Sequence, residues 1–222
     1  MASFSFNRRE IVLLTLFLAS AFGALAAFAT AHHDLVLLLK PLPALALAAL
    51  LLPYPASYCR LLVAGLVASA AGDLLLELGP QRFLWGVGAF FLAHLAYIAA
   101  FLLAERRLAP LAALPALALG LVVFPRLLPG LEQQQLFVPV LVYTLALCAM
   151  FWRALARISR GASSAVIAGA CGAAAFAASD SLLALARFSG DSEPIPHVRY
   201  AILGLYWLGQ LGITLSAPRS FR

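Results

Sequence analysis

The sequence predicts an all-α fold: a polytopic membrane helix bundle of about eight transmembrane helices, formed by residues 1–222 as a single integral membrane domain. Two observations predict this class. Hydrophobic residues make up 64% of the chain and charged residues 11%, with a mean hydropathy of +0.99, so polar groups are too few to cover a water-facing surface. The apolar residues also fall into runs of about 16 to 22, the length of a bilayer-spanning helix, and no run alternates as a barrel strand does.

The first four expected spans are bounded by residues that interrupt an apolar run. Basic residues precede the first, a proline ends the second, a glycine ends the third, and a charged triplet follows the fourth. The four spans are residues 11–30, 35–53, 58–79 and 83–104.

The last four expected spans are delimited in the same way. The fifth and sixth are short and carry Pro115 and Pro139, whereas arginines stand at the end of the seventh and the start of the eighth. Connections are short, and no linker rich in serine or glycine divides the chain. The four spans are residues 109–124, 136–151, 163–186 and 198–216.

The arginines predict the orientation. With a cytoplasmic N-terminus, the cytoplasmic side collects Arg8, Arg9, Arg60, Arg106, Arg107, Arg153, Arg157, Arg160, Arg219 and Arg222. The far side then holds only Arg82, Arg126, Arg187 and Arg199. We therefore expect both termini in the cytoplasm. The net charge of +6 is explained by this topology and by anionic headgroups, so no nucleic-acid partner is expected.

The first span also resembles a secretory signal, because Arg8 and Arg9 precede an apolar run that ends in small residues at 29–31. We expect the segment to be retained. Its apolar run is long for a signal, and its loss would remove both the even number of spans and the arginine asymmetry.

No metal or other cofactor is expected. Cys59, Cys148 and Cys171 are scattered without metal or redox spacing, which is typical of small packing residues. The phrase His-His-Asp at residues 32–34 contains metal-binding side chains, but adjacent residues on one turn rarely converge on a single ion.

Two aspartates lie deep inside apolar spans. Asp73 and Asp180 sit in nearly the same phrase, Gly-Asp-Leu-Leu at residues 72–75 and Ser-Asp-Ser-Leu-Leu at residues 179–183. A carboxylate in hydrocarbon costs roughly 3 kcal/mol even on a lenient insertion scale, so the default interpretation is a functional site inside the bilayer. Because the two spans are four apart, they run in the same direction, as a parallel repeat of four plus four helices requires.

Further polar residues are expected to join the aspartates. A rise of about 1.5 Å per residue puts Asp73 and Asp180 roughly two turns below the outer ends of their spans, and Lys40 reaches a similar depth. Nearer the midplane, four polar side chains of the fourth and eighth spans are expected to form the floor of one cavity: His94, Tyr97, Tyr206 and Gln210.

Each of these residues also has a structural interpretation. Lys40 can extend to the interface or satisfy carbonyls freed by the neighbouring prolines, and His94 can donate to a carbonyl inside the core. Tyr206 and Gln210 can form interhelical hydrogen bonds. Glu77, one turn outward of the first aspartate, can simply reach the interface.

Five motifs follow one another along the chain: Lys40-Pro41-Leu42-Pro43; Gly65 and Ser69 before the phrase at 72–75; the stripe Gly86, Phe90, His94 and Tyr97; Phe176 before the phrase at 179–183; and Tyr206 with Gln210. In this order and on these spans they resemble the YhhN-like lysoplasmalogenase family. The resemblance implies an eight-helix membrane hydrolase that cleaves the vinyl ether bond of lysoplasmalogens, releasing a fatty aldehyde and glycerophosphocholine or glycerophosphoethanolamine. It also implies that Asp73 and Asp180 carry the reaction.

Two carboxyl groups suit this chemistry. An enol ether is activated by a proton on its β-carbon, and the oxocarbenium ion that forms takes up water, so the reaction needs an acid and a base but no metal. Two close carboxyl groups in a low dielectric do not readily both ionise, so one is expected to remain protonated as the acid while the other stays anionic. Lys40 would bias which acid stays charged or bind the lipid phosphate.

Two other functions remain open. Paired intramembrane acids with a lysine also suit a small proton- or cation-coupled transporter, which usually has helix breaks beside matched sites in both halves. The stretches around Asp73 and Asp180 instead read as unbroken helices. A non-catalytic lipid-binding or assembly protein is the third possibility, and it would tolerate neutral replacement of either aspartate.

The expected partners are the lysophospholipid substrate and the bilayer itself, and composition carries no signal for a particular oligomeric state. We expect the substrate to enter sideways from the outer leaflet, with its headgroup at the interface. Abundant alanine, leucine and arginine, with a single lysine, indicate a GC-rich bacterial genome. The expected location is therefore the bacterial inner membrane.

Overall fold

A computed structural model describes residues 7–189 and 198–217 of the chain. Over these residues the protein is helical, with nine α-helices, three short 3-10 turns and no strand, so the predicted all-α class is confirmed. The α-helices are α1 (Arg8–Ala29), α2 (His33–Leu39), α3 (Leu42–Leu51), α4 (Ser57–Glu77), α5 (Phe83–Ala104), α6 (Leu114–Gln133), α7 (Phe137–Ala156), α8 (Ser164–Phe188) and α9 (Val198–Leu215).

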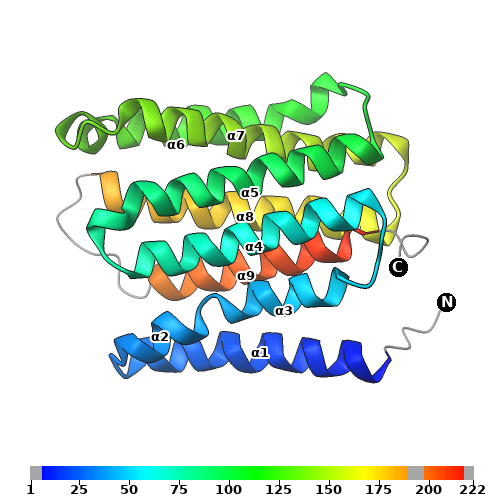
Figure 1. Ribbon diagram of the computed structural model, residues 1–222. Helices are drawn as coiled ribbons and strands as arrows, with labels where there is room; N and C mark the ends of the chain where they lie inside the picture. Colours follow the sequence, from blue (N-terminus) through cyan, green and yellow to red (C-terminus); the bar gives the residue numbers. More distant parts are fainter. Residues whose placement is uncertain (1–6, 190–197, 218–222) are drawn as a thin grey trace.

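The helices lie side by side in one elongated bundle (Figure 1). Helices α1 to α3 form one side, α4 and α9 come next, α5 and α8 follow, and α6 with α7 forms the opposite side. Helix α1 begins and α9 ends at the same end of the bundle. The arginine asymmetry predicts that this end faces the cytoplasm, although two contributors, Arg219 and Arg222, lie outside the described residues.

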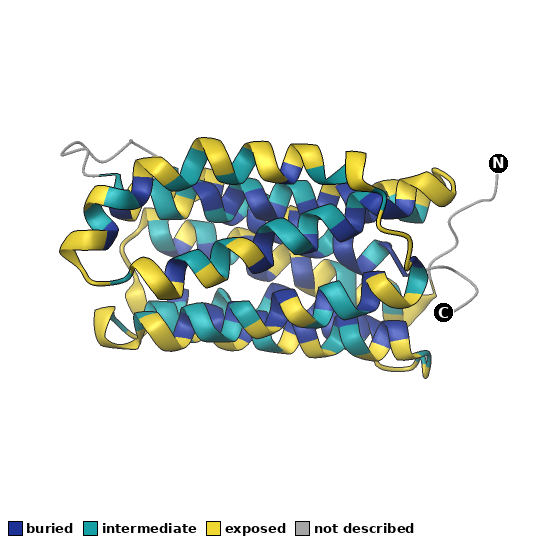
Figure 2. Ribbon diagram, turned by 90° about the horizontal axis from the view of Figure 1, so that it is seen from above, coloured by how far each residue is buried: buried dark blue, intermediate teal, exposed yellow. Residues whose placement is uncertain are grey.

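Seven helical segments of the described chain are long and apolar enough to cross a membrane, with α2 and α3 counted as one segment. Exposed residues line the outward faces of the bundle (Figure 2). Many are large and apolar, such as Leu111 at 79% and Leu121 at 75% exposure, which is favourable only where lipid replaces water. The protein is therefore a multi-pass integral membrane protein.

The second span is broken, whereas the sequence predicted one continuous helix over residues 35–53. Helix α2 ends at Leu39 and α3 starts at Leu42, with Lys40 at the break. Pro41 and Pro43 have no backbone N–H to continue the helical ladder. The break leaves Lys40 at the corner between two short helices.

The fifth and sixth spans are not short, and that prediction was wrong. Helix α6 continues through Pro125 and Pro129 to Gln133, so it extends past the expected end at residue 124 and contains Arg126. Each proline removes one helical hydrogen bond, a loss that neighbouring helices offset within a membrane. Helices α6 and α7 have 20 residues each.

Glycines allow two helix pairs to approach closely. Helix α4 packs most extensively along α5, and α8 along α9. A Cβ atom added at Gly172 of α8 would lie 2.6 Å from the backbone nitrogen of Ile213 on α9, so only glycine fits there. Each aspartate-bearing helix therefore pairs with the next helix in the chain. A repeat of four plus four helices would produce this pattern, but the repeat itself stays a prediction.

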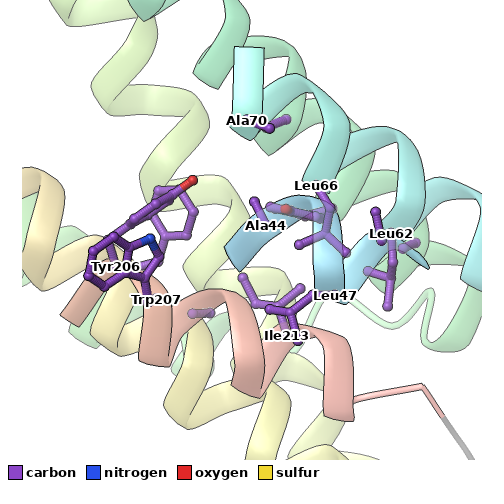
Figure 3. Packing of buried hydrophobic residues seen from close by; sticks show 14 of the residues in the cluster. Ala44, Leu47, Leu62, Leu66, Ala70, Tyr206, Trp207 and Ile213 are labelled. Atoms are coloured by element: carbon purple, nitrogen blue, oxygen red, sulfur yellow. The ribbon is translucent and has the colours of Figure 1, made fainter. Parts of the chain in front are cut away.

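The main hydrophobic core has buried members from α1, α3, α4, α5, α7, α8 and α9, and Figure 3 shows the part of it where α3, α4 and α9 meet. Leu47 of α3, Leu62 and Leu66 of α4, and Trp207 and Ile213 of α9 are all nearly inaccessible there. Tyr206 belongs to the same cluster, so its ring is fixed by apolar packing.

Two of the arginines counted as cytoplasmic are buried. Arg153 of α7 donates to the backbone carbonyls of Glu105 and Arg107. Arg157 donates from Nη1 to Tyr58 Oη at 2.7 Å and from Nη2 to the Ser216 carbonyl at 3.1 Å. Arg153 thus joins α7 to the segment after α5, and Arg157 joins the end of α7 to α4 and to the residue that follows α9.

Candidate functional site

Asp73 is enclosed in the core between α4 and α9. Its exposure is only 2%, and the hydroxyl of Tyr206 donates a hydrogen bond to its Oδ2 at 2.6 Å. The preceding Gly72 allows this fit, because a Cβ atom there would lie 2.6 Å from Cδ2 of Phe90 on α5. The small residue of the sequence phrase thus lets α5 pack beside the carboxylate.

Asp180 of α8 is only partly buried, with 12% of its side chain exposed. The hydroxyl of Tyr143 on α7 donates to its Oδ2. His94 on α5 directs Nε2 toward the same oxygen, at a separation of 3.8 Å that is longer than a hydrogen bond. Because the His94 Nδ1 lies 2.6 Å from the carbonyl of Phe90, which can only accept, Nδ1 carries the proton.

Both aspartates line one cavity of about 410 Å³, which we call the chamber. Helices α4, α5, α8 and α9 form most of its wall, and α1 and the α2–α3 break complete it. Its charged and hydroxyl-bearing lining residues are Lys40, Asp73, Glu77, Ser179, Asp180, Arg187, Arg199 and Tyr206. The chamber thus brings together carboxylates and cations from segments far apart in the sequence.

Lys40 is held by Glu77 at the edge of the chamber. Its Nζ lies 3.0 Å from Glu77 Oε2, and the two side chains are only 11% and 13% exposed. His33 approaches the other oxygen of Glu77 at 3.6 Å. Lys40 is therefore neither simply extended to the interface nor bonded directly to an aspartate.

Two arginines of the chamber stack on aromatic rings. The guanidinium of Arg187 lies 3.8 Å from the centre of the Phe83 ring, and that of Arg199 lies 4.9 Å from the centre of the Phe28 ring. Stacking orders both side chains while leaving their N–H groups able to bind an anion.

The remaining expected residues lie behind the chamber. Tyr97 donates to Gln210 Oε1 at 2.6 Å, both side chains are fully buried, and neither is among the chamber-lining residues. The structure thus brings Lys40 and Tyr206 to the chamber, His94 to Asp180, and pairs Tyr97 with Gln210 outside the lining.

Tyr143 was not among the residues expected at the site. It lies in the middle of an apolar span, where a tyrosine carries no local mark of its partner. The only available signal was its phenol in a run of otherwise apolar side chains. Its role depends on how α7 is rotated against α8.

Two narrower apolar grooves adjoin Asp180. One, of about 40 Å³, runs between α6, α7 and α8, and the other, of about 60 Å³, lies between α4, α5, α7 and α8. Both grooves are lined by Val140, Tyr143, Asp180 and Ala184. Asp180 therefore lines both the chamber, with its charged residues, and two apolar grooves.

The chain is similar to proteins of known family. The YhhN family model matches residues 35–217, which include every candidate site residue. Lysoplasmalogenase TMEM86B of Homo sapiens is 39% identical over 189 residues, covering 82% of this chain and 75% of that protein. The lysoplasmalogenase of Mycobacterium bovis is 40% identical over 146 residues, covering 61% of this chain and 53% of that protein. No solved structure matches. The extent of the family match shows that the chain belongs to the YhhN family.

Proposed function

We propose that this protein hydrolyses the vinyl ether bond of lysoplasmenyl choline or ethanolamine lipids, releasing a fatty aldehyde and the glycerophospho-headgroup. The observation that carries the proposal is that Asp73 and Asp180, from α4 and α8, line the same chamber. Two relatives named lysoplasmalogenase, from Homo sapiens and Mycobacterium bovis, support it.

The reaction uses the two carboxyl groups as acid and base. One delivers a proton to the β-carbon of the vinyl ether, and the other stabilises the oxocarbenium ion and orients the water that adds to the α-carbon. The resulting hemiacetal collapses to aldehyde and alcohol, so one water is consumed overall. Tyr206 and Tyr143 each bond to Oδ2 of their aspartate, which leaves Oδ1 as the oxygen for substrate or water.

The cations of the chamber bind the phosphate of the substrate. Lys40, Arg187 and Arg199 all line it, and guanidinium groups suit phosphate oxygens. If the arginine asymmetry fixes the orientation, the chamber opens toward the outer leaflet, and a single-chain lipid enters from there. Tyr206 contacts the substrate, whereas His94, Tyr97 and Gln210 act by positioning the residues around it.

Helix continuity argues against the transporter alternative. Asp73 and Asp180 both lie within unbroken helices, α4 and α8. The break at Lys40 has no counterpart in α7, the helix four spans further along the chain. A transporter with matched sites would be expected to have breaks in both halves.

Aldehyde release from a purified sample tests the function. In mild detergent, wild-type protein is expected to release fatty aldehyde from a lysoplasmenyl lipid, and Asp73→Asn or Asp180→Asn to lower the rate by about 100-fold or more. Glu132→Gln, a matched loss of an exposed carboxylate at the end of α6, is expected to keep full activity.

Two outcomes would overturn the proposal. One is full activity in either folded aspartate variant, because that would remove the carboxyl pair from the reaction. The other is the absence of aldehyde from folded wild-type protein with both headgroups, in which case proton flux in vesicles becomes the next measurement.

A further inference from the structure

We propose that His94 makes Asp180 the proton donor of the reaction and thereby leaves Asp73 as the base. This inference rests on the proposed function and deepens it, because the reaction alone does not choose between the two carboxyl groups. His94 is not among the residues that line the chamber, so it acts through Asp180 as a positioning residue and does not touch the substrate.

The imidazole of His94 presents an unprotonated nitrogen to Asp180. Its Nδ1 donates to the Phe90 carbonyl, and the rings of Tyr143 and Phe176 pack edge-on against it, each with its centre 5.1 Å away. Its Nε2 is buried, lies 3.8 Å from Asp180 Oδ2 and has no hydrogen-bond partner in the described part of the chain. An imidazolium would bury a charge with one N–H unbonded, so the neutral ring, with a lone pair on Nε2, fits this site.

A lone pair directed at Oδ2 favours the protonated form of Asp180. It repels the negative charge of a carboxylate more strongly than it repels a neutral carboxylic acid. Oδ2 also accepts the hydrogen bond from Tyr143. The acid proton therefore belongs on Oδ1, the oxygen that is left for the substrate.

Asp73 has no such neighbour among the described residues. It also accepts a hydrogen bond from a tyrosine, Tyr206, so the tyrosines do not distinguish the two carboxyl groups. The other described histidines, at positions 32 and 33, lie at the start of α2, where His33 approaches Glu77. The imidazole is thus specific to the Asp180 side of the chamber.

The other charged groups do not reverse this difference. Within residues 7–189 and 198–217, no lysine or arginine forms an ion pair with either aspartate, and Glu77 is paired with Lys40. The four charged side chains below line the chamber that both aspartates share, and the thiol lines a groove. Besides Asp73 and the two tyrosines, the titratable or charged residues that line a space with Asp180 are Lys40, Glu77, Arg187, Arg199 and Cys148.

This assignment closes the reaction cycle without a proton from elsewhere. Asp180 gives its proton to the β-carbon, and water adds to the α-carbon while Asp73 takes one proton from that water. When the C–O bond of the hemiacetal breaks, Asp73 returns this proton to the glycerol oxygen and Asp180 takes the proton of the hemiacetal hydroxyl. Both carboxyl groups then have their starting forms again, and one water has been consumed.

The pH dependence of kcat tests the assignment. At saturating lysoplasmenyl lipid, the alkaline fall of kcat marks the loss of the proton from the acid. His94→Gln, whose amide can donate to Oδ2, is expected to move this fall to lower pH by about one unit. His94→Asn keeps a donor for the Phe90 carbonyl but places nothing against Asp180, so it is expected to give a smaller shift in the same direction.

Tyr97→Phe is the matched control. It removes a buried polar group one turn along α5 from His94, where the partner is Gln210 and not an aspartate. It is expected to leave the pH of the alkaline fall unchanged, whatever its effect on the rate. A purely structural role of His94 would likewise lower kcat equally at every pH.

Infrared spectroscopy follows the same proton without substrate. The carboxylic C=O band that disappears when Asp180→Asn is added to Asp73→Asn protein belongs to Asp180. In Asp73→Asn protein, His94→Gln is expected to lower the pH at which this band is lost by about one unit. Independently of any His94 variant, Asp73→Asn protein, which retains Asp180, is expected to keep its band to higher pH than Asp180→Asn protein, which retains Asp73.

The failures can be told apart. If wild-type protein releases aldehyde but neither readout moves to lower pH in folded His94→Gln or His94→Asn, the role of His94 is wrong and the proposed function stands. If the His94 variants do not fold, a band that persists to higher pH for Asp73 than for Asp180 overturns the assignment. Absence of aldehyde from wild-type protein refutes the function itself, even where the infrared band shifts as expected.

Discussion

Asp73 and Asp180 occupy similar phrases in the sequence but different surroundings in the fold. Each accepts a hydrogen bond from a tyrosine of another helix. Asp73 is almost fully buried, one helical turn from the ion pair of Glu77 with Lys40. Asp180 is partly exposed and lines both the chamber and two apolar grooves. The difference shows that two equivalent phrases can provide unequal carboxyl groups, as an acid and base pair requires.

The largest expected effect comes from combining the two aspartate substitutions. If Asp73 and Asp180 act in the same reaction step, the double Asn variant will be no slower than the slower single variant, because removing one partner already disables the other. Single-turnover aldehyde release measures this. Strictly additive losses in folded proteins would show instead that the two carboxyl groups act independently.

Removing the tyrosine hydroxyls is expected to have the next largest effect. Tyr143→Phe and Tyr206→Phe each leave a carboxyl group without its donor, which costs about 1–3 kcal/mol and corresponds to a loss of about 5- to 150-fold in kcat. Tyr97→Phe is the control, since the hydroxyl of Tyr97 donates to the amide of Gln210. It should lower kcat less than Tyr143→Phe or Tyr206→Phe. An equal loss of kcat in all three variants would show that the hydroxyls matter for packing and not for their hydrogen bonds to the carboxyl groups.

A smaller effect is expected from Lys40, which lies at the end of the site proposed to bind the phosphate of the headgroup. Lys40→Gln is expected to raise KM for a phospholipid substrate by about fivefold to tenfold, and to leave KM for an alkenylglycerol without phosphate unchanged. Glu77→Gln frees Lys40 from its ion pair and should not raise KM for either substrate. A rise with both substrates in Lys40→Gln would contradict phosphate binding and point to a structural role at the α2–α3 break.

The last expected effect is on stability rather than on activity, and it tests the packing beside Asp73. Gly72→Ala forces a Cβ atom to within 2.6 Å of Phe90 Cδ2 and is expected to lower the free energy of unfolding by about 1–3 kcal/mol. Gly88→Ala meets no neighbour, and the helix propensity of alanine should leave it neutral or slightly more stable. Thermal unfolding in detergent compares the two variants. Equal stability would mean that α5 moves aside at little cost.

Local patterns in the sequence were enough to predict the helical class and most helix positions. Hydropathy acts residue by residue along a span, so the apolar runs marked the helices without any knowledge of their neighbours. Placing a carboxylate inside an apolar span costs free energy, so Asp73 and Asp180 marked the candidate site without any knowledge of their neighbours. Prolines were harder to interpret: those at 41 and 43 coincide with a break, whereas Pro125 and Pro129 lie inside α6.

The sequence alone determined that the chain is a helical membrane protein with two intramembrane aspartates on helices that run in the same direction. Only the tertiary structure decided which side chains meet them. The bonds from Tyr143 to Asp180 and from Tyr206 to Asp73, and the pairing of Lys40 with Glu77, join helices distant in the sequence. These contacts depend on how each helix is rotated and how closely it packs, which glycines at the interfaces control and hydropathy along a single helix does not specify.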